Sequence, residues 1–160
     1  MKIGHICLDT VDAGKLNRIA ALVEAIARQG VEQHILVASR ELALRLAACP
    51  HLSVGPTVRS PIMAYCLMPE VELVHVHDDK SGQAALLLKL TRSIPFIITM
   101  DASFANDTSP LGRSVRNRAS LAISEAYSAS SQPQGLEQLH IYQQALSRRS
   151  EFPEYANRRH

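Results

Sequence analysis

The sequence has few aromatic residues and almost no excess of charge. Aromatic side chains make up 4% of its 160 residues, and 17 lysines and arginines stand against 15 aspartates and glutamates, which leaves a formal net charge of +2. Proteins that bind nucleic acid usually carry a basic excess for the phosphates and aromatic rings on which bases stack. The composition therefore does not favour a nucleic-acid-binding surface, and we predict no nucleic-acid partner.

Long apolar runs are also missing. No run approaches the roughly 18 residues of a membrane-spanning helix. The apolar start at residues 3–8 is cut off by Asp9 and Thr10, too early for a signal peptide. Three cysteines are scattered without the spacing of metal ligands, and their odd number in apolar surroundings suits reduced, buried thiols. We therefore expect a cytoplasmic protein.

What the sequence does contain is an alternation of short apolar runs with segments whose apolar residues recur at helical spacing. We predict strands at residues 2–8, 34–38, 52–54, 71–77, 95–99 and 121–123, with helices between them. Such alternation implies parallel strands joined by right-handed crossovers. The predicted fold class is α/β, a Rossmann-like doubly wound three-layer sandwich with a mostly parallel sheet of about six or seven strands.

Local signals place several helix ends. Ser39 and Ser109 are predicted N-caps, the second of them followed by a proline, and Gly30 is predicted to end a helix in a left-handed conformation. The helix after residue 77 is expected to take its cap from residues 79–81. From residue 148 onward the composition is polar and charged, which is typical of a loose tail.

The strand at residues 71–77 leads into the strongest candidate site. His77 and Asp78 stand at its carboxyl end, where loops of an open α/β sheet line the ligand crevice. A histidine beside a carboxylate can hold a sugar hydroxyl or orient an acceptor; alternatively, the histidine caps the next helix. His75 lies deeper on the same strand face and is expected to be a hydrogen-bonded core histidine. Two histidines on one face can chelate a metal, but no further cluster completes the set, so we predict no metal site.

Further candidates lie in other loops at the same edge. Gly14, with Lys15 and Arg18, can cradle a diphosphate at a helix start, or can form an ordinary strand-to-helix turn with solvated cations. Asp101 follows the strand at 95–99 and is a candidate for binding sugar hydroxyls. Ser124 follows the last predicted strand and is a further substrate-binding candidate, although a role as N-cap alone explains it.

Taken in order, these stretches resemble the N-terminal domain of family-4 glycosyltransferases of the GT-B fold. The matching segments are the loop at 12–15, residues 30–38, the His-x-His motif at 74–78, the "x-P-x-x-x-T" strand at 94–99, and residues 121–126 and 135–142. Ala13-Gly14 stands where the family commonly has two glycines, and Met100-Asp101 where it often has a histidine. The resemblance covers residues 1–146 and implies that residues 147–160 are a hinge remnant or flexible tail.

The resemblance implies an acceptor-side domain of a hexosyltransferase. Such an enzyme transfers a sugar from a nucleotide-sugar donor to a glycan or glycoside of the cell envelope, lipopolysaccharide included. In this fold a C-terminal domain makes most donor contacts, and these 160 residues do not contain one. The chain is therefore expected to be inactive alone and to bind donor only with that domain; no cofactor and no catalytic residue are predicted.

Two alternatives stay open. The first is a non-catalytic binding or self-association module on the same scaffold, with a second copy or another chain as partner. The second concerns location. Arg113, Arg116 and Arg118 do not share one helical face, which favours a solvated helix, but a patch for an anionic acceptor or for the inner membrane surface is the other interpretation.

Overall fold

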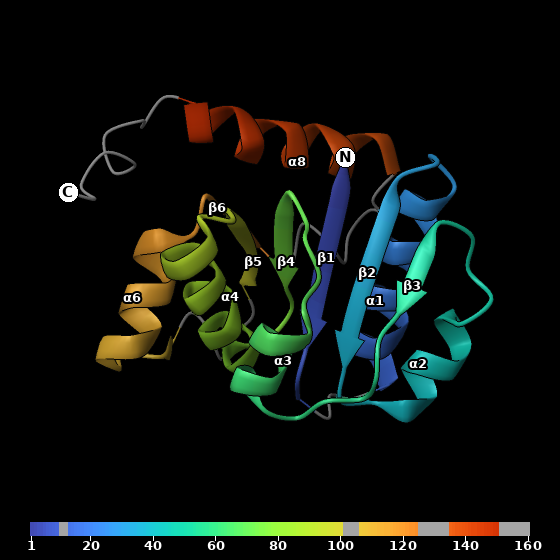
Figure 1. Cartoon of the computed structure of the whole chain (residues 1–160), viewed down its shortest axis with the longest axis horizontal. Coiled ribbons are helices and arrows are strands. Elements are labelled where there is room, and N and C mark those ends of the chain that lie inside the picture. Colours follow the sequence, from blue (N-terminus) through green and yellow to red (C-terminus); the bar gives the residue numbers. More distant parts are fainter. Residues whose placement is uncertain (10–12, 101–105, 125–134, 151–160) are drawn as a thin grey trace.

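The computed structural model of the chain describes residues 1–9, 13–100, 106–124 and 135–150 (Figure 1). The described strands form one six-stranded sheet in the order β3-β2-β1-β4-β5-β6, and every neighbouring pair is parallel. Their bounds are β1 Lys2–Cys7, β2 Glu32–Val37, β3 Leu52–Val54, β4 Leu73–Val76, β5 Phe96–Met100 and β6 Leu121–Ser124. The predicted Rossmann-like α/β fold is confirmed.

Helices cover both faces of this sheet, so the strands are buried on two sides and read as almost continuous apolar runs. The helices are α1 Ala13–Ala27, α2 Arg40–Leu46, α3 Pro61–Leu67, α4 Asp79–Arg92, α6 Pro110–Arg118 and α8 Gly135–Ser150. The face with α3, α4 and α6 has one apolar core, and α1, α2 and α8 pack on the other face. Figure 1 shows α3 and α4 in front of the sheet, α1 behind it and α8 running across the top.

Most of the predicted caps are present. The Ser39 side chain accepts a hydrogen bond from the Leu42 amide, Ser109 accepts one from Gly112, and Gly30 has a φ of 72°. The cap of α4 was predicted wrongly, because it is Asp78 and not a residue of 79–81. Aspartate is among the best N-cap residues, and the extended backbone of Asp78 suits that position.

Helix α8 differs most from the sequence-based expectation. The loose tail predicted from residue 148 is wrong for residues 148–150, which continue the helix, and the expected boundary after residue 146 lies inside α8. Gln138, Tyr142 and Ala145 are buried at a spacing of four and three residues, which is one helical face. Polarity alone does not end a helix, and the first proline after Gly135 is Pro153.

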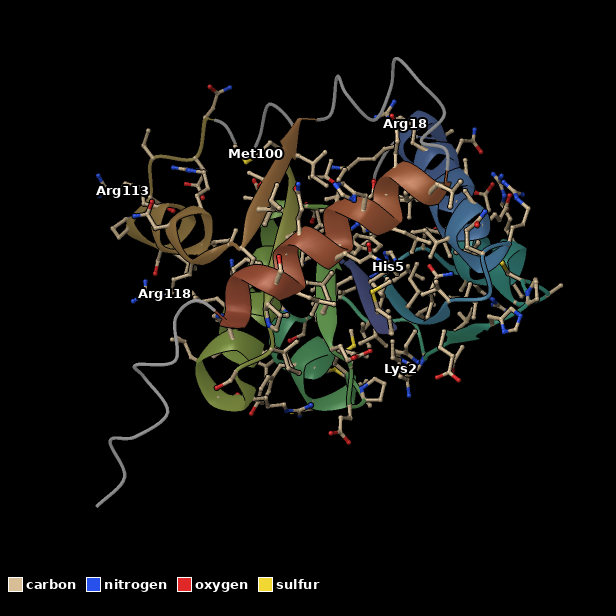
Figure 2. All side chains as sticks on the ribbon, turned by 90° about the horizontal axis from the view of Figure 1, so that it is seen from above. Lys2, His5, Arg18, Met100, Arg113 and Arg118 are labelled. Atoms are coloured by element: carbon tan, nitrogen blue, oxygen red, sulfur yellow. The ribbon has the colours of Figure 1, made fainter. Side chains whose placement is uncertain are left out.

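Three further observations bear on the other predictions. The three cysteines are free, but only Cys7 is buried, because Cys49 is half-buried and Cys66 lies exposed on the short helix α3. None of the helices in the described part of the chain combines the length and hydropathy that crossing a bilayer requires. Arg113 and Arg118 project from α6 at the outside of the molecule, as a solvated helix would have them (Figure 2). A patch for an anionic acceptor or for a membrane surface stays the alternative interpretation.

Candidate functional site

The site lies where the sheet changes its winding direction. Strands β1 and β4 are neighbours at the centre of the sheet, β2 and β3 lie on one side of them, and β5 and β6 lie on the other. In open α/β sheets, ligands bind in the crevice at the carboxyl ends of the two strands that flank such a switch point. The residues that follow β1 and β4, among them His77 and Asp78, therefore occupy the position expected for a ligand site.

Asp78 connects two segments at this edge of the sheet through hydrogen bonds. Its carboxylate is buried and accepts hydrogen bonds from the Leu8 amide at 2.7 Å, the Ser81 amide at 2.8 Å and the Ser81 hydroxyl at 2.8 Å. Leu8 follows β1 and Ser81 lies in the first turn of α4, so one carboxylate joins two elements. Asp78, and not His77, is the residue that caps the helix. A contact between Asp78 and a substrate stays a prediction.

Replacing Asp78 by alanine should lower the free energy of unfolding by about 2 to 3 kcal/mol. The change leaves the buried Ser81 amide without its acceptor and the Leu8 amide with only the longer bond to the Ser81 hydroxyl at 3.1 Å, and unpaired buried donors are strongly destabilising. Ser109→Ala is the matched control, because it removes an exposed cap and should lower stability by about 1 kcal/mol. Urea denaturation of both variants tests this, and equal losses would show that the link from Asp78 to Leu8 adds nothing.

Three histidines meet beside this edge. His5 of β1 and His75 of β4 are register partners, and His77 follows two residues later on the same strand face. All three are at most 2% exposed. The Nδ1 atom of His5 lies 3.2 Å from Nε2 of His77, and one ring nitrogen from each of the three lies within 4.8 Å of the others. The sheet thus brings together one histidine from near the start of the chain and two from its middle.

Partners around the cluster orient two of these rings. Gln33 donates from Nε2 to the Val23 carbonyl at 3.1 Å. Its Oε1 atom, 3.1 Å from Nε2 of His5, therefore accepts a hydrogen bond from that ring nitrogen. His75 has the Tyr142 hydroxyl 2.9 Å from Nδ1 and the Thr99 hydroxyl 2.8 Å from Nε2. The prediction that His75 is a hydrogen-bonded core histidine is confirmed.

Burial keeps the cluster neutral. Loss of water lowers the pKa of His5 to about 4, with the hydrogen bond to Gln33 opposing part of that change. Desolvation likewise holds the pKa values of His75 and His77 well below the ordinary value, and the neighbouring histidines lower them further. Burial also raises the pKa of the Tyr142 hydroxyl far above its usual range. At neutral pH the cluster is therefore a set of uncharged donors and acceptors.

A partly open cavity of about 30 Å³ reaches this cluster from the side of α1 and α8. This is enough for about two water-sized groups. Its lining residues are Lys15, Arg18, Ile19, Leu22, His75, His77, Thr99, Ile123 and Gln138. Figure 2 shows α8 passing across the molecule, with Arg18 labelled near one end of the helix and His5 beside its middle. The amide nitrogen of Gln138 is buried and makes no hydrogen bond of normal geometry to any residue that the structure describes. Gln138 nevertheless lies close enough to the Tyr142 hydroxyl to oppose the rise of its pKa.

The predicted site residues fall into three groups. Lys15 and His77 line the same cavity, and Gly14 directly precedes Lys15 in the first turn of α1. Asp78 lies at the same edge, and its oxygens accept hydrogen bonds from the backbone amides of Leu8, just after β1, and Ser81 in α4. Asp101 lies outside the described residues, and Ser124 is the last residue of β6, whose side chain is not among those described. Substrate binding by these residues stays a prediction.

Sequence reasoning missed His5, Gln138 and Tyr142. A signal for His5 was available, because a doubly wound sheet places its first strand beside the one that carries His75, and both residues lie near the middle of these strands. Nothing comparable pointed to Tyr142, since its position depends on how α8 crosses the sheet. No family model matches the sequence, and a search of the curated proteins finds no match either.

Proposed function

We propose that this chain is an acceptor-side glycosyltransferase domain. Joined to a donor-binding domain, it would transfer a sugar from a nucleotide sugar to a glycan or glycoside of the cell envelope. The observation that carries this proposal is that Lys15, from the glycine-bearing turn, and His77, from the His-x-His motif, line one cavity beside the switch point of a parallel sheet. The resemblance noted in the sequence requires these two segments to face a common ligand.

The chemistry of the cavity suits one oxygen-bearing group of such a ligand. The amide of Gln138 is a buried donor, His77 is neutral, and a lysine and an arginine contribute positive charge. Hydroxyl or phosphoryl oxygens would match these groups. At about 30 Å³ the cavity is far below the roughly 300 Å³ or more of a pocket for a whole small ligand. The rest of the sugar would therefore have to lie outside it, against a second wall.

The experiment is a calorimetric titration of the chain with nucleoside diphosphates, nucleotide sugars and simple glycosides. We expect weak glycoside binding by the chain alone, and nucleotide-sugar binding only when a donor-binding domain is supplied. Lys15→Gln should weaken glycoside binding about tenfold, as the loss of one charged hydrogen bond predicts. Lys80→Gln is the matched control, because Lys80 is the second residue of α4, on the other face of the sheet, and does not line the cavity. If neither carbohydrate nor nucleotide binds, whether the chain is alone or combined with a donor-binding domain, the proposal is overturned.

A second candidate function, self-association, is favoured by exposed apolar side chains on α3. Ile62, Met63 and Leu67 are 66%, 54% and 40% exposed on a helix of seven residues. Groups of large exposed apolar residues often mark interaction surfaces. Sedimentation of the chain should show a dimer that Met63→Glu dissociates, whereas Leu136→Glu on α8 should leave it unchanged. A monomer at all concentrations would remove this candidate.

A further inference from the structure

We propose that His5, His75 and His77 form a binding site for a divalent transition-metal ion, with Zn²⁺ as the best match. Zinc is commonly held by imidazole nitrogens at about 2.0 to 2.1 Å in a tetrahedral arrangement. Ligand atoms at the corners of such a tetrahedron are roughly 3.3 Å apart. The 3.2 Å between His5 Nδ1 and His77 Nε2 fits one edge, and one ring nitrogen from each of the three histidines lies within 4.8 Å of the other two.

The hydrogen bonds prepare His5 as a ligand. Because Gln33 is held by the Val23 carbonyl, Nε2 of His5 carries the proton and Nδ1 presents its lone pair toward His77. Metal-bound histidines usually have this arrangement, with the second nitrogen donating to an oxygen that orients the ring. Gln33 would be that orienting partner.

His77 needs one proton shift to join the site. Its Nε2 atom faces the lone pair of His5 and, in the hydrogen-bonded pair, carries the proton. Moving this proton from Nε2 to Nδ1 of the same neutral ring frees a second lone pair without changing the charge. Both lone pairs then converge on the space between the rings, where the hydrogen bond is replaced by two bonds to the ion.

His75 can supply the third nitrogen from either side of its ring. One side faces the Tyr142 hydroxyl and the other faces the Thr99 hydroxyl. A hydroxyl both donates and accepts, so whichever nitrogen turns to the ion, the other keeps an oxygen partner. The ring would give up one of its two hydrogen bonds.

The surroundings supply access and a fourth position. His75 and His77 line the cavity of about 30 Å³, which can hold a water-sized ligand next to the ion. Three protein nitrogens plus one exchangeable ligand is the usual composition of an open zinc site. Lys15 and Arg18 line the same cavity, so an anionic fourth ligand such as hydroxide or a carboxylate would be favoured over neutral water. The inference does not depend on the proposed glycosyltransferase function.

The test uses the full chain after treatment with a chelator. Competition with a chromophoric chelator should show one Zn²⁺ ion bound per chain. Bound Co²⁺ should produce the visible absorption bands of a tetrahedral site. Bound Zn²⁺ should also raise the melting temperature, because it stabilises the folded state. His5→Gln and His77→Gln should each weaken binding about 100-fold or more, and Gln33→Leu should weaken it about 10- to 100-fold.

His51→Gln and His140→Gln are the matched controls, since both histidines are exposed and lie outside the cluster. Stoichiometric binding that survives His5→Gln and His77→Gln in folded protein would place the ion elsewhere and overturn the proposal. The wild-type chain gives a second criterion that does not depend on folding of a variant. If excess Zn²⁺ leaves its melting temperature unchanged and Co²⁺ gives no tetrahedral bands, the three histidines are only a hydrogen-bonded part of the core.

Discussion

Lowering the pH from 7 to 5 is expected to remove roughly 5 kcal/mol from the free energy of unfolding. The loss comes from His5, His75 and His77, whose rings are neutral in the fold and become charged when the chain unfolds. Folded domains typically have only about 5 to 15 kcal/mol of stability. Mild acid alone should therefore bring this chain close to unfolding, well above the pH at which most carboxylates titrate.

The sign follows from where each pKa lies. Burial lowers the pKa of His5 from 6.5 to about 4 and holds those of His75 and His77 well below 6.5, with the charge of Lys15 also acting against protonation of His77. Above pH 6.5 neither state binds these protons, so their contribution is constant. Below pH 6.5 the unfolded chain binds more protons, and stability falls by up to about 1.4 kcal/mol per pH unit for each histidine. For His5 the fall ends near pH 4.

Urea denaturation at several pH values between 7 and 5, with a chelator present, checks this expectation. His77→Gln removes one of the three titrating rings and should reduce the slope by about one third. His140→Gln on the exposed face of α8 should not change the slope. Stability that stays flat across this range would contradict the neutral, buried state of the cluster.

Tyr142→Ala is expected to destabilise the fold by about 4 kcal/mol. Tyr142 is fully buried on the sheet-facing side of α8 and belongs to the same apolar core as Leu22, Leu73 and Ile97. Its hydroxyl lies 2.9 Å from Nδ1 of His75. Truncation removes the ring contacts, leaves a cavity and deprives His75 of a partner. These effects act in the same direction.

Two variants separate these effects in urea denaturation. Tyr142→Phe keeps the ring and removes only the hydroxyl, so a loss of about 1 to 2 kcal/mol is expected. Leu136→Ala, at a position on α8 that is 67% exposed, should change stability by no more than about 0.5 kcal/mol. If Tyr142→Ala were as mild as Leu136→Ala, α8 would not hold the position that it has in the structure.

Much of the fold followed from local patterns in the sequence. Residues 2–8 and 71–77 were predicted as strands, and the structure has β1 at Lys2–Cys7 and β4 at Leu73–Val76. Short apolar runs, helix-spaced segments and N-cap serines act over a few residues, so one sequence suffices to find them. The extent of helix α8 was harder to predict, because its buried residues lie three to four positions apart in a stretch that is otherwise polar.

Only some of the residues of the candidate site could be predicted from the sequence. His77 and Lys15 were predicted to face one crevice, because both follow parallel strands at the same edge of the sheet, and they do line one cavity. The metal interpretation was set aside because a third ligand was lacking. In the proposed site His5 is that ligand, and its position follows from the strand register that aligns β1 with β4.

The sequence by itself determined the α/β class, the parallel winding and the edge at which His77 and Lys15 lie, because these depend on periodicity and on the direction of each strand. Only the tertiary structure decided that His5 meets His77 across 72 residues and that Tyr142 reaches His75 across 67. Such contacts depend on strand register and on the angle at which α8 crosses the sheet. Both are set by the packing of side chains far apart in the chain, which no local pattern encodes.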